Sequence, residues 1–431
     1  MNRLHVRRLA ALVLMAACCA QAAAAEVAGG FAASSAFGYP AELPPQALVR
    51  QALERLPELE AARAGIRWSA AERQRLESGP HEWSLRGETA QRRTRGEGHF
   101  RDHEITIERP LRWFGKAGKD GQIGQQTVAL AEAAHADVWH EAGRALLAAW
   151  FAWLREERAA GRIAAQAALS QQWLDGMAKR VRAGESPKMQ WLLAQTEHER
   201  LLAVLQQAAQ RAELARIALE QKYPGLPLPA HPADAPLPEV PAAGAQQGDW
   251  VARITAGNHE VEQAAAQTRQ KQLQAERSAL DRKPDPTLAL RYTTERSGAD
   301  RMIGVAVSIP LPGQARSAAY AGALAQLDQA SQQEQQVRGK VERQARQLAA
   351  QAQAAAINAA AQARISQLAQ SNAALVAKAY ALGESAFADT LLANRQALEA
   401  AQVFEAAHID ALELHARILL DAHLIWAFER E

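Results

Sequence analysis

The hydrophobic and polar positions of the 431-residue chain repeat one order of elements twice. Each copy begins with a helical pattern, continues with two alternating, strand-like segments, and then enters a very long helical pattern, a short turn and a final helix. For the first copy, 26–222, we expect a helix near 45–78 that breaks at Pro57, a hairpin at about 82–110, a long helix at about 121–182 and a helix at about 189–222. For the second copy, 246–431, we expect a helix near 250–281, a hairpin at about 287–310, a long helix at about 315–382 and a helix at about 387–428.

Matching segments in the two copies indicate an internal duplication. Gly184-Glu185-Ser186 matches Gly383-Glu384-Ser385 at an offset of 199, and Pro110 matches Pro310 at an offset of 200. Landmarks that recur in order at nearly constant spacing point to a duplicated domain rather than a solenoid of short repeats. Between the copies lies 223–245, which is so dense in proline that it cannot be helix interior and is expected to be an extended linker.

The second hairpin shows the clearer alternation. Leu288, Leu290 and Tyr292 alternate with small or polar residues, and so do Ile303 and Val305 on the next strand. Strands of about nine residues match a tilted transmembrane β-strand. A soluble hairpin that is half-buried on a core explains the alternation equally well.

The first hairpin is less regular. Its tip carries many charges and belongs in water, whereas Trp113 and Phe114 at its exit suit either a membrane–water interface or ordinary packing. The charged tip residues are Arg92, Arg93, Arg95, Glu97, Arg101 and Asp102.

The length of the long helical patterns restricts the architecture. A helix of about 65 residues is roughly 100 Å long, which exceeds the span of a compact domain. The chain has only four predicted strands, too few to close a barrel by itself. Several chains must therefore pool their strands if the membrane interpretation of the hairpins is right.

Composition supports extended helices. About half of the 48% hydrophobic residues are alanine, and aromatic residues make up only 5% of the chain. Alanine favours helix and lets neighbouring helices approach closely, but it fills little core volume. The composition therefore argues against one large soluble α/β enzyme.

Residues 1–25 resemble a secretory signal peptide. Three arginines precede a short apolar run, and small residues at 22–25 offer a cleavage site. The alternatives are a membrane anchor and a lipoprotein signal that is lipidated at Cys18 or Cys19. Removal of this segment takes away both cysteines and leaves 46 basic against 47 acidic residues, so the charge changes from +2 to about −1. A near-neutral balance gives no support for nucleic-acid binding.

Candidate chemistry is sparse. Each of the His-Glu pairs lacks the second histidine of an HExxH zinc motif, and no glycine spacing fits a nucleotide loop. The remaining histidines, among them His99, His103, His408, His415 and His423, are scattered. We therefore expect no catalytic residues, no cofactor and no metal site.

The ordered set of features resembles the outer-membrane efflux proteins, the TolC-like family. The likeness rests on three segments of the sequence. They are the opening helix from Gln46 to Leu59, the Lys283-Pro284-Asp285-Pro286 entry to the third strand, and the strand-end residues Pro110 and Pro310. The proline-aspartate-proline entry is similar to the heavy-metal, CzcC-like branch. The resemblance implies a mainly α fold with a membrane β-barrel: a homotrimer whose 12 pooled strands cross the outer membrane and whose helices form a periplasmic α-helical barrel with coiled-coil packing.

The resemblance also implies functional positions. The turns Gly184-Glu185-Ser186 and Gly383-Glu384-Ser385 correspond to the tips where a periplasmic adaptor docks, although they could be merely turns. Asp389 falls on an aperture position and could form a ring of charge in the trimer, or it could be a solvated helix residue. The family's second aspartate position is Leu392 here, and the first copy has the neutral Gln190 instead.

The expected function is passive export through the outer membrane as the exit duct of a tripartite, RND-type efflux system. The partners would be an adaptor, an inner-membrane pump and outer-membrane lipid, and the cargo would be divalent heavy-metal cations. Multidrug or organic-compound efflux is one alternative, and a soluble periplasmic helical scaffold is another.

Overall fold

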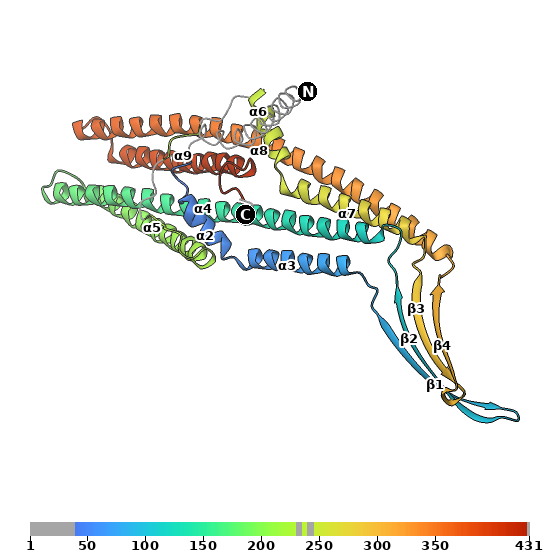
Figure 1. The fold of residues 1–431 in the computed structure, drawn as a ribbon. Helices are drawn as coiled ribbons and strands as arrows, with labels where there is room; N and C mark the ends of the chain where they lie inside the picture. The colour runs from blue at the N-terminus through green and yellow to red at the C-terminus, as the bar shows by residue number, and fades with distance from the viewer. Residues whose placement is uncertain (1–38, 230–234, 239–244, 429–431) are drawn as a thin grey trace, which may run out of the picture. The chain divides into compact units, whose positions relative to one another are not determined.

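The computed structural model describes residues 39–229, 235–238 and 245–428 (Figure 1). The expected signal peptide at 1–25 and much of the expected linker at 223–245 lie outside the described residues. Within them, the expectation of a mainly helical chain with two β-hairpins is confirmed. None of the described helices combines the length and the apolar character that crossing a membrane requires.

The described elements occur in the same order twice. The first set is α2 (Gln46–Glu54), α3 (Pro57–Ser78), β1 (Ser84–Thr94), β2 (Gly98–Pro110), α4 (Lys116–Arg182) and α5 (Lys188–Lys222). The second set is α6 (Ala245–Ala256), α7 (His259–Asp281), β3 (Thr287–Glu295), the 3-10 turn η2 (Arg296–Gly298), β4 (Asp300–Ser308), α8 (Gln314–Leu382) and α9 (Phe387–Asp421). With 67 and 69 residues, α4 and α8 are each roughly 100 Å along their own axes.

The opening helix of each copy is broken at equivalent places by different residues. Pro57 is the first residue of α3, where its missing N–H costs nothing. We expected one helix over 250–281, but two helices occupy this stretch. Asn258 separates them because its side chain accepts a hydrogen bond from the Val261 amide at 3.1 Å and so caps α7.

The chain forms two compact units that do not coincide with the sequence copies. Unit 1 comprises Met1–Val49, Leu147–Glu239 and Ala355–Ala427, and unit 2 comprises Arg50–Leu146, Val240–Ala354 and Phe428–Glu431. Each unit therefore takes segments from both copies, and α4 and α8 each contribute residues to both units.

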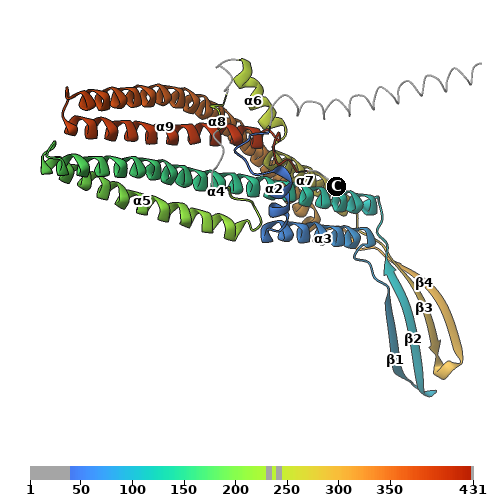
Figure 2. The same cartoon turned by 90° about the vertical axis from the view of Figure 1, so that its left-hand side faces the viewer.

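Unit 1 is built from two helical hairpins. The second part of α4 pairs with α5, and the second part of α8 pairs with α9 (Figure 2). Small side chains fill much of the interface between α8 and α9, where buried alanines cluster in two groups, Ala359 with Ala407 and Ala411, and Ala373 with Ala393 and Ala397. The alanine-rich composition thus allows close helix packing here.

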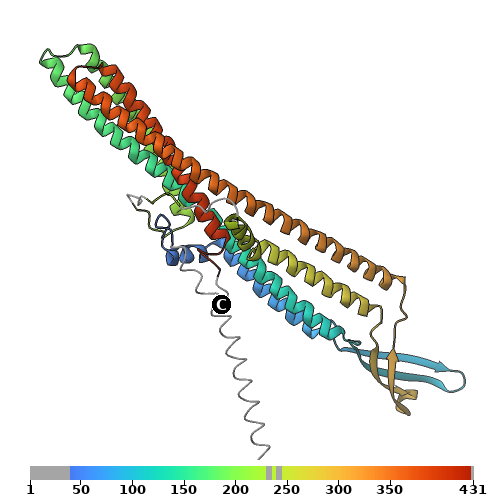
Figure 3. The same cartoon turned by 90° about the horizontal axis from the view of Figure 1, so that it is seen from above.

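Unit 2 contains the first part of α4 beside α3, the first part of α8 beside α7, and the sheet (Figure 3). Hydrogen bonds cross between these helices. The amide of Gln126 on α4 donates to Ala266 O on α7 at 3.0 Å, and the hydroxyl of Thr268 on α7 donates to Ala330 O on α8 at 3.3 Å.

All four strands form one antiparallel sheet in the order β1-β2-β3-β4. The two predicted hairpins are joined because β2 pairs with β3, with Ile107 opposite Leu290 and Ile105 opposite Tyr292. The third pairing places Leu290 opposite Val305. Strands β1 and β4 are the two edges of this sheet.

Candidate functional site

The two predicted turn tips have the same backbone geometry. Gly184 has φ of +75° and Gly383 has φ of +81°. The amide that follows each glycine donates to the carbonyl five residues earlier, at 2.9 Å for Glu185 and 2.8 Å for Glu384. This bond is the mark of a Schellman helix ending, which requires a left-handed residue. A Cβ at either glycine would meet no atom within 4 Å, so the backbone conformation rather than lack of space accounts for glycine.

The other turn residues lie at the surface. Glu185 and Glu384 are exposed, and Ser186 and Ser385 are half-buried. The Ser385 hydroxyl donates to Val376 O at 3.3 Å, which ties the second turn back to α8. Each tip therefore presents a hydrogen-bonded backbone reversal and one exposed carboxylate.

Asp389 has a local structural contact. It is exposed near the start of α9, and its carboxylate accepts a hydrogen bond from the Ala386 amide at 3.1 Å. A carboxylate in the first turn satisfies an amide that the helix leaves unpaired and interacts favourably with the helix dipole. Asp389 thus caps α9, and this contact neither requires nor excludes a role in the aperture.

A cluster of apolar side chains beneath both turns, here called the tip cluster, was missed by the sequence analysis. Four helices contribute to it, and the Arg180 guanidinium on α4 both donates to the Tyr380 hydroxyl at 2.9 Å and lies 5.2 Å from the centre of its ring. Only 5% of the residues in the chain are aromatic, yet four aromatic residues lie within eleven residues of the turn glycines. This concentration could have predicted the cluster from the sequence. The cluster consists of Trp173, Leu174, Met177, Trp191, Ala194, Tyr380, Phe387 and Leu391.

A buried carboxylate joins α5 to α9 close to the tip cluster. Glu197 is 5% exposed and accepts hydrogen bonds from Nε of Arg395 on α9 at 2.8 Å and from the guanidinium of Arg200 on its own helix at 2.8 Å. Burial by itself raises the pKa of Glu197, but the bonds from Arg395 and Arg200 outweigh it and hold the pKa below 4.5. Because Glu197 and Arg395 are 198 residues apart, the sequence alone does not reveal that they form a pair.

One face of the sheet in unit 2 is apolar and exposed. Leu85, Ile107, Leu290 and Val305 lie in register across all four strands. They are exposed by 75%, 40%, 50% and 71%, whereas a soluble hairpin on a core would bury them. Monomeric soluble proteins rarely expose a contiguous apolar surface of this kind. The same face also carries Ile105, Leu288, Tyr292, Ile303 and Val307.

The opposite face of the sheet is polar, and its arginines are paired with carboxylates. Arg92 contacts Asp102 at 3.1 Å and Glu295 at 2.9 Å, which links β1 to β2 and β3. Similar pairs join Arg86 to Glu108 at 3.4 Å and Arg291 to Glu104 at 3.7 Å. The sheet therefore separates apolar from ionic side chains, as the alternation predicted.

The proline-aspartate-proline segment forms the junction between helices and sheet. Asp285 accepts hydrogen bonds from Lys116 Nζ at 2.9 Å and from the Trp113 amide at 3.2 Å, and His81 Nε2 lies at 3.2 Å. Burial raises the pKa of Asp285, but the bond from Lys116 leads the effects that bring it below 3.8. Lys116 is 1% exposed and also donates to Lys283 O at 2.7 Å. These contacts give the Lys283-Pro284-Asp285-Pro286 segment, which carried the family resemblance, a structural role at the entry to β3.

The strand-end prolines occupy different places. Pro110 is the last residue of β2, opposite Thr287, whereas β4 ends at Ser308, two residues before Pro310. A proline cannot donate to the ladder; the Leu111 amide, next to Pro110, still donates to Pro286 O at 2.8 Å, and Pro310 lies outside the paired residues of β4.

The histidines do not converge. Among the described residues, no three His, Cys, Asp or Glu side chains lie together as a metal site would require. His99 and His103 stand on the first hairpin, and burial lowers the pKa of His415 on α9.

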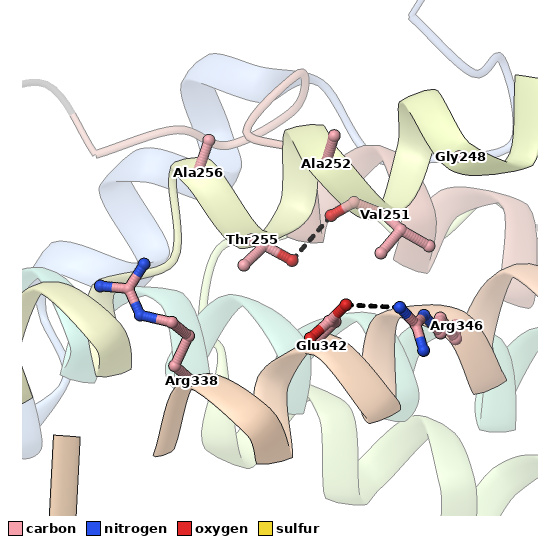
Figure 4. A pocket seen from close by; sticks show the side chains of 8 residues that line it. All are labelled: Gly248, Val251, Ala252, Thr255, Ala256, Arg338, Glu342 and Arg346. Carbon is pink, nitrogen blue, oxygen red and sulfur yellow. Dashed lines mark hydrogen bonds and ion pairs between the residues drawn. The ribbon is translucent and has the colours of Figure 1, made fainter. Parts of the chain in front are cut away.

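A hollow of about 740 Å³ lies between α6 and α8 in unit 2 (Figure 4). Its polar groups bond within their own helices: the Thr255 hydroxyl donates to Val251 O at 2.7 Å, and Glu342 pairs with Arg346 at 2.5 Å. Because Thr255, Glu342 and Arg346 are engaged in these bonds, we do not propose the hollow as a ligand site. The lining residues are Gly248, Val251, Ala252, Thr255, Ala256, Arg338, Glu342 and Arg346.

No protein-family model matches the chain, and no curated protein matches it. Solved structures do match it. CusC, described as forming a transmembrane channel, is 14% identical with a TM-score of 0.70, and the match covers 87% of this chain and 91% of CusC. The outer membrane protein VceC of Vibrio cholerae is 14% identical, with a TM-score of 0.67 and coverage of 88% and 99%.

The MtrE outer membrane channel of Neisseria gonorrhoeae, solved in its open state, is 18% identical, with a TM-score of 0.64 and coverage of 90% of both chains. At these identities the likeness is one of fold. The chain therefore has the fold of outer-membrane channels, the TolC-like fold that its duplicated sequence led us to expect.

Proposed function

We propose that this protein is the outer-membrane exit duct of a tripartite efflux system and that it exports its cargo passively, without catalysis. The observation that carries the proposal is the exposed apolar face of the four-stranded sheet, attached to helices of 67 and 69 residues. Such a face is stable against lipid and costly in water. A soluble periplasmic scaffold, the alternative, would expose this apolar face to water.

The duct is proposed to be a homotrimer. One chain supplies four strands and leaves β1 and β4 as edges, so three chains joined edge to edge close a 12-stranded barrel in the outer membrane. The ion-paired face then lines the lumen and the apolar face meets lipid, which is the alternation of transmembrane barrels. The helices extend the duct into the periplasm.

The partners are proposed to be a periplasmic adaptor and an inner-membrane pump of the RND type. The adaptor would dock at the tips, where Gly184-Glu185-Ser186 and Gly383-Glu384-Ser385 reverse the chain and expose a glutamate each. For the cargo we favour divalent heavy-metal cations, supported by the branch resemblance and by the exposed carboxylate of Asp389. Organic compounds are the alternative cargo.

Fractionation and single-channel recording test the duct. We expect the protein in the detergent-soluble outer-membrane fraction, and we expect purified protein to open pores in a planar phosphatidylcholine bilayer. A soluble periplasmic monomer, or well-folded trimer that never conducts, would refute the proposal.

Substitution of Asp389 separates its two roles. In Asp389→Asn the amide oxygen still accepts from the Ala386 amide, so we expect the unfolding temperature to change little while the charge is lost. If three copies of Asp389 line the aperture, cation selectivity, measured as the reversal potential in a salt gradient, decreases in the variant. Unchanged selectivity would reject the aperture role and leave only the cap.

A further inference from the structure

The apolar face of the sheet ends in a basic band. Arg301 lies two residues beyond Ile303 on β4, and Arg101 and Arg93 follow toward the turn between β1 and β2. Strand alternation places all three on the same face as Ile105 and Ile303, and all three are exposed. Here this group, Arg93, Arg101 and Arg301, is called the basic band.

The two faces of the sheet differ in how their arginines are satisfied. Every Asp or Glu of the four strands lies on the polar face, where Arg86, Arg92 and Arg291 are each paired with a carboxylate. Among the residues that the structure describes, none of the guanidinium groups in the basic band has an acidic partner. The carboxylates concerned are Glu88, Asp102, Glu104, Glu108, Glu295 and Asp300.

Position and charge together indicate the partner. The band adjoins the apolar rows at the turn end only. At the opposite end the same face has the exposed Trp83, with Arg109 5.3 Å from its ring centre and bonded to His81 O at 3.2 Å. A surface that meets acyl chains and then three unpaired guanidiniums matches a lipid whose headgroup bears phosphate, because guanidinium binds phosphate with paired, charge-assisted hydrogen bonds.

We propose that the basic band binds phosphate-bearing lipids of the leaflet that surrounds the turn end of the sheet. The proposal rests on the proposed function, since it takes the apolar face as the lipid contact. It adds a preference for one lipid chemistry, and it gives the two ends of the apolar face different partners: aromatic side chains at the helix end and headgroup phosphates at the turn end.

The test uses the full-length protein in phosphatidylcholine discs that contain either diphosphoryl lipid A or its dephosphorylated form. The lipid retained by the protein is measured by mass spectrometry. We expect enrichment of the phosphorylated form, and in Arg93→Gln/Arg101→Gln/Arg301→Gln we expect that enrichment to fall on the order of tenfold or more, since each arginine near an anionic surface contributes to binding. Arg86→Gln/Arg92→Gln/Arg291→Gln removes the same number of charges from the polar face and should retain the enrichment.

Separate outcomes identify which idea fails. Insertion and conductance in phosphatidylcholine alone are measured first, and their absence would refute the proposed function. If the protein inserts and conducts but shows no preference for the phosphorylated lipid, or if both triple variants lose it equally, the lipid proposal is overturned. Binding of inorganic phosphate without enrichment of diphosphoryl lipid A would also overturn it, because the site would then take free phosphate.

Discussion

Two glycines determine where the long helices reverse. Gly184 and Gly383 adopt φ of +75° and +81°, a region in which a Cβ clashes with the backbone. The space around them is open, so the cost of substitution is conformational rather than steric crowding by neighbours. These two residues could be identified from the sequence because a helix reversal needs a left-handed residue at a defined place.

Substitution of Gly383 should therefore destabilise unit 1 modestly. We expect Gly383→Ala to lower the free energy of unfolding by about 1 kcal/mol, measured by denaturant titration in detergent. Gly161→Ala is the matched control, since Gly161 is exposed within α4 and should gain up to about 1 kcal/mol. Equal effects of the two substitutions would contradict the role of the positive φ.

Glu197 gives unit 1 a dependence on pH. Because its pKa in the folded protein is below 4.5, its ion pair stabilises the fold above the pKa of the unfolded chain. That contribution is lost as the pH falls through the lower, folded pKa. The carboxylate is buried, whereas Arg395 is half-exposed and can be hydrated. Loss of the pair therefore destabilises the fold mainly through the lost hydrogen bonds and ionic contacts of the buried carboxylate.

We predict that Glu197→Gln lowers the free energy of unfolding by about 1–3 kcal/mol at pH 7. The difference from wild type should shrink as the pH is lowered from 7 to below 4, because wild type then loses the same charge. Thermal melts across this range measure the effect. Glu185→Gln, at an exposed carboxylate without a basic partner among the described residues, should show no such convergence, and a pH-independent difference for Glu197→Gln would refute the assignment.

At the scale of elements, the sheet is the informative part. Strand alternation in the sequence predicts two faces, but it does not say which face meets the rest of the protein. None of the described residues covers the apolar rows of the sheet, whereas cross-strand ion pairs link charged side chains on the opposite face. This difference supports the proposed lipid contact on the apolar side.

Adjacent substitutions on β4 test the two faces. Val305→Arg places a charge among the apolar rows, and we expect it to reduce the amount of protein in the outer-membrane fraction, since arginine at the middle of a bilayer costs about 2–4 kcal/mol. Ala306→Arg places the same residue on the polar face one position away and should insert nearly normally. Similar loss with both variants would indicate a general folding defect and would count against the lipid-facing assignment.

The junction at the base of the sheet was only partly predictable. The Lys283-Pro284-Asp285-Pro286 segment stood out in the sequence as a resemblance, without a physical reason. Its reason is the contact of Asp285 with Lys116 and with the Trp113 amide, which fastens the start of α4 to the entry of β3. Because Lys116 and Asp285 are 169 residues apart, their spacing alone cannot reveal the contact.

At the scale of the whole molecule, duplication and compactness divide the chain differently. The sequence repeats with a period near 200 residues, yet each compact unit takes segments from both copies. The copies are therefore not independent domains. Four strands from one chain form a sheet with two edges, so the proposed barrel needs the strands of other copies to close.

Cross-linking tests that assembly. We predict that cysteine at Leu85 on β1, combined in turn with cysteine at Ile303, Val305 or Val307 on β4, yields a covalent trimer for one combination, seen by mass under denaturing, non-reducing conditions. The native cysteines, Cys18 and Cys19, are replaced by serine in every variant. Single-cysteine variants are the controls, and covalent products no larger than a dimer for all three pairs would contradict the closed trimer.

The sequence by itself determined the local features of this protein. Turn glycines, strand alternation and the duplication depend on neighbouring residues or on a fixed offset, so they can be read along the chain. The tertiary structure decided how those features combine: it joined the two hairpins through β2 and β3, paired Glu197 with Arg395, and left the apolar face of the sheet uncovered. These outcomes depend on contacts between residues far apart in the sequence, where periodicity indicates that a face exists but not which surface it meets.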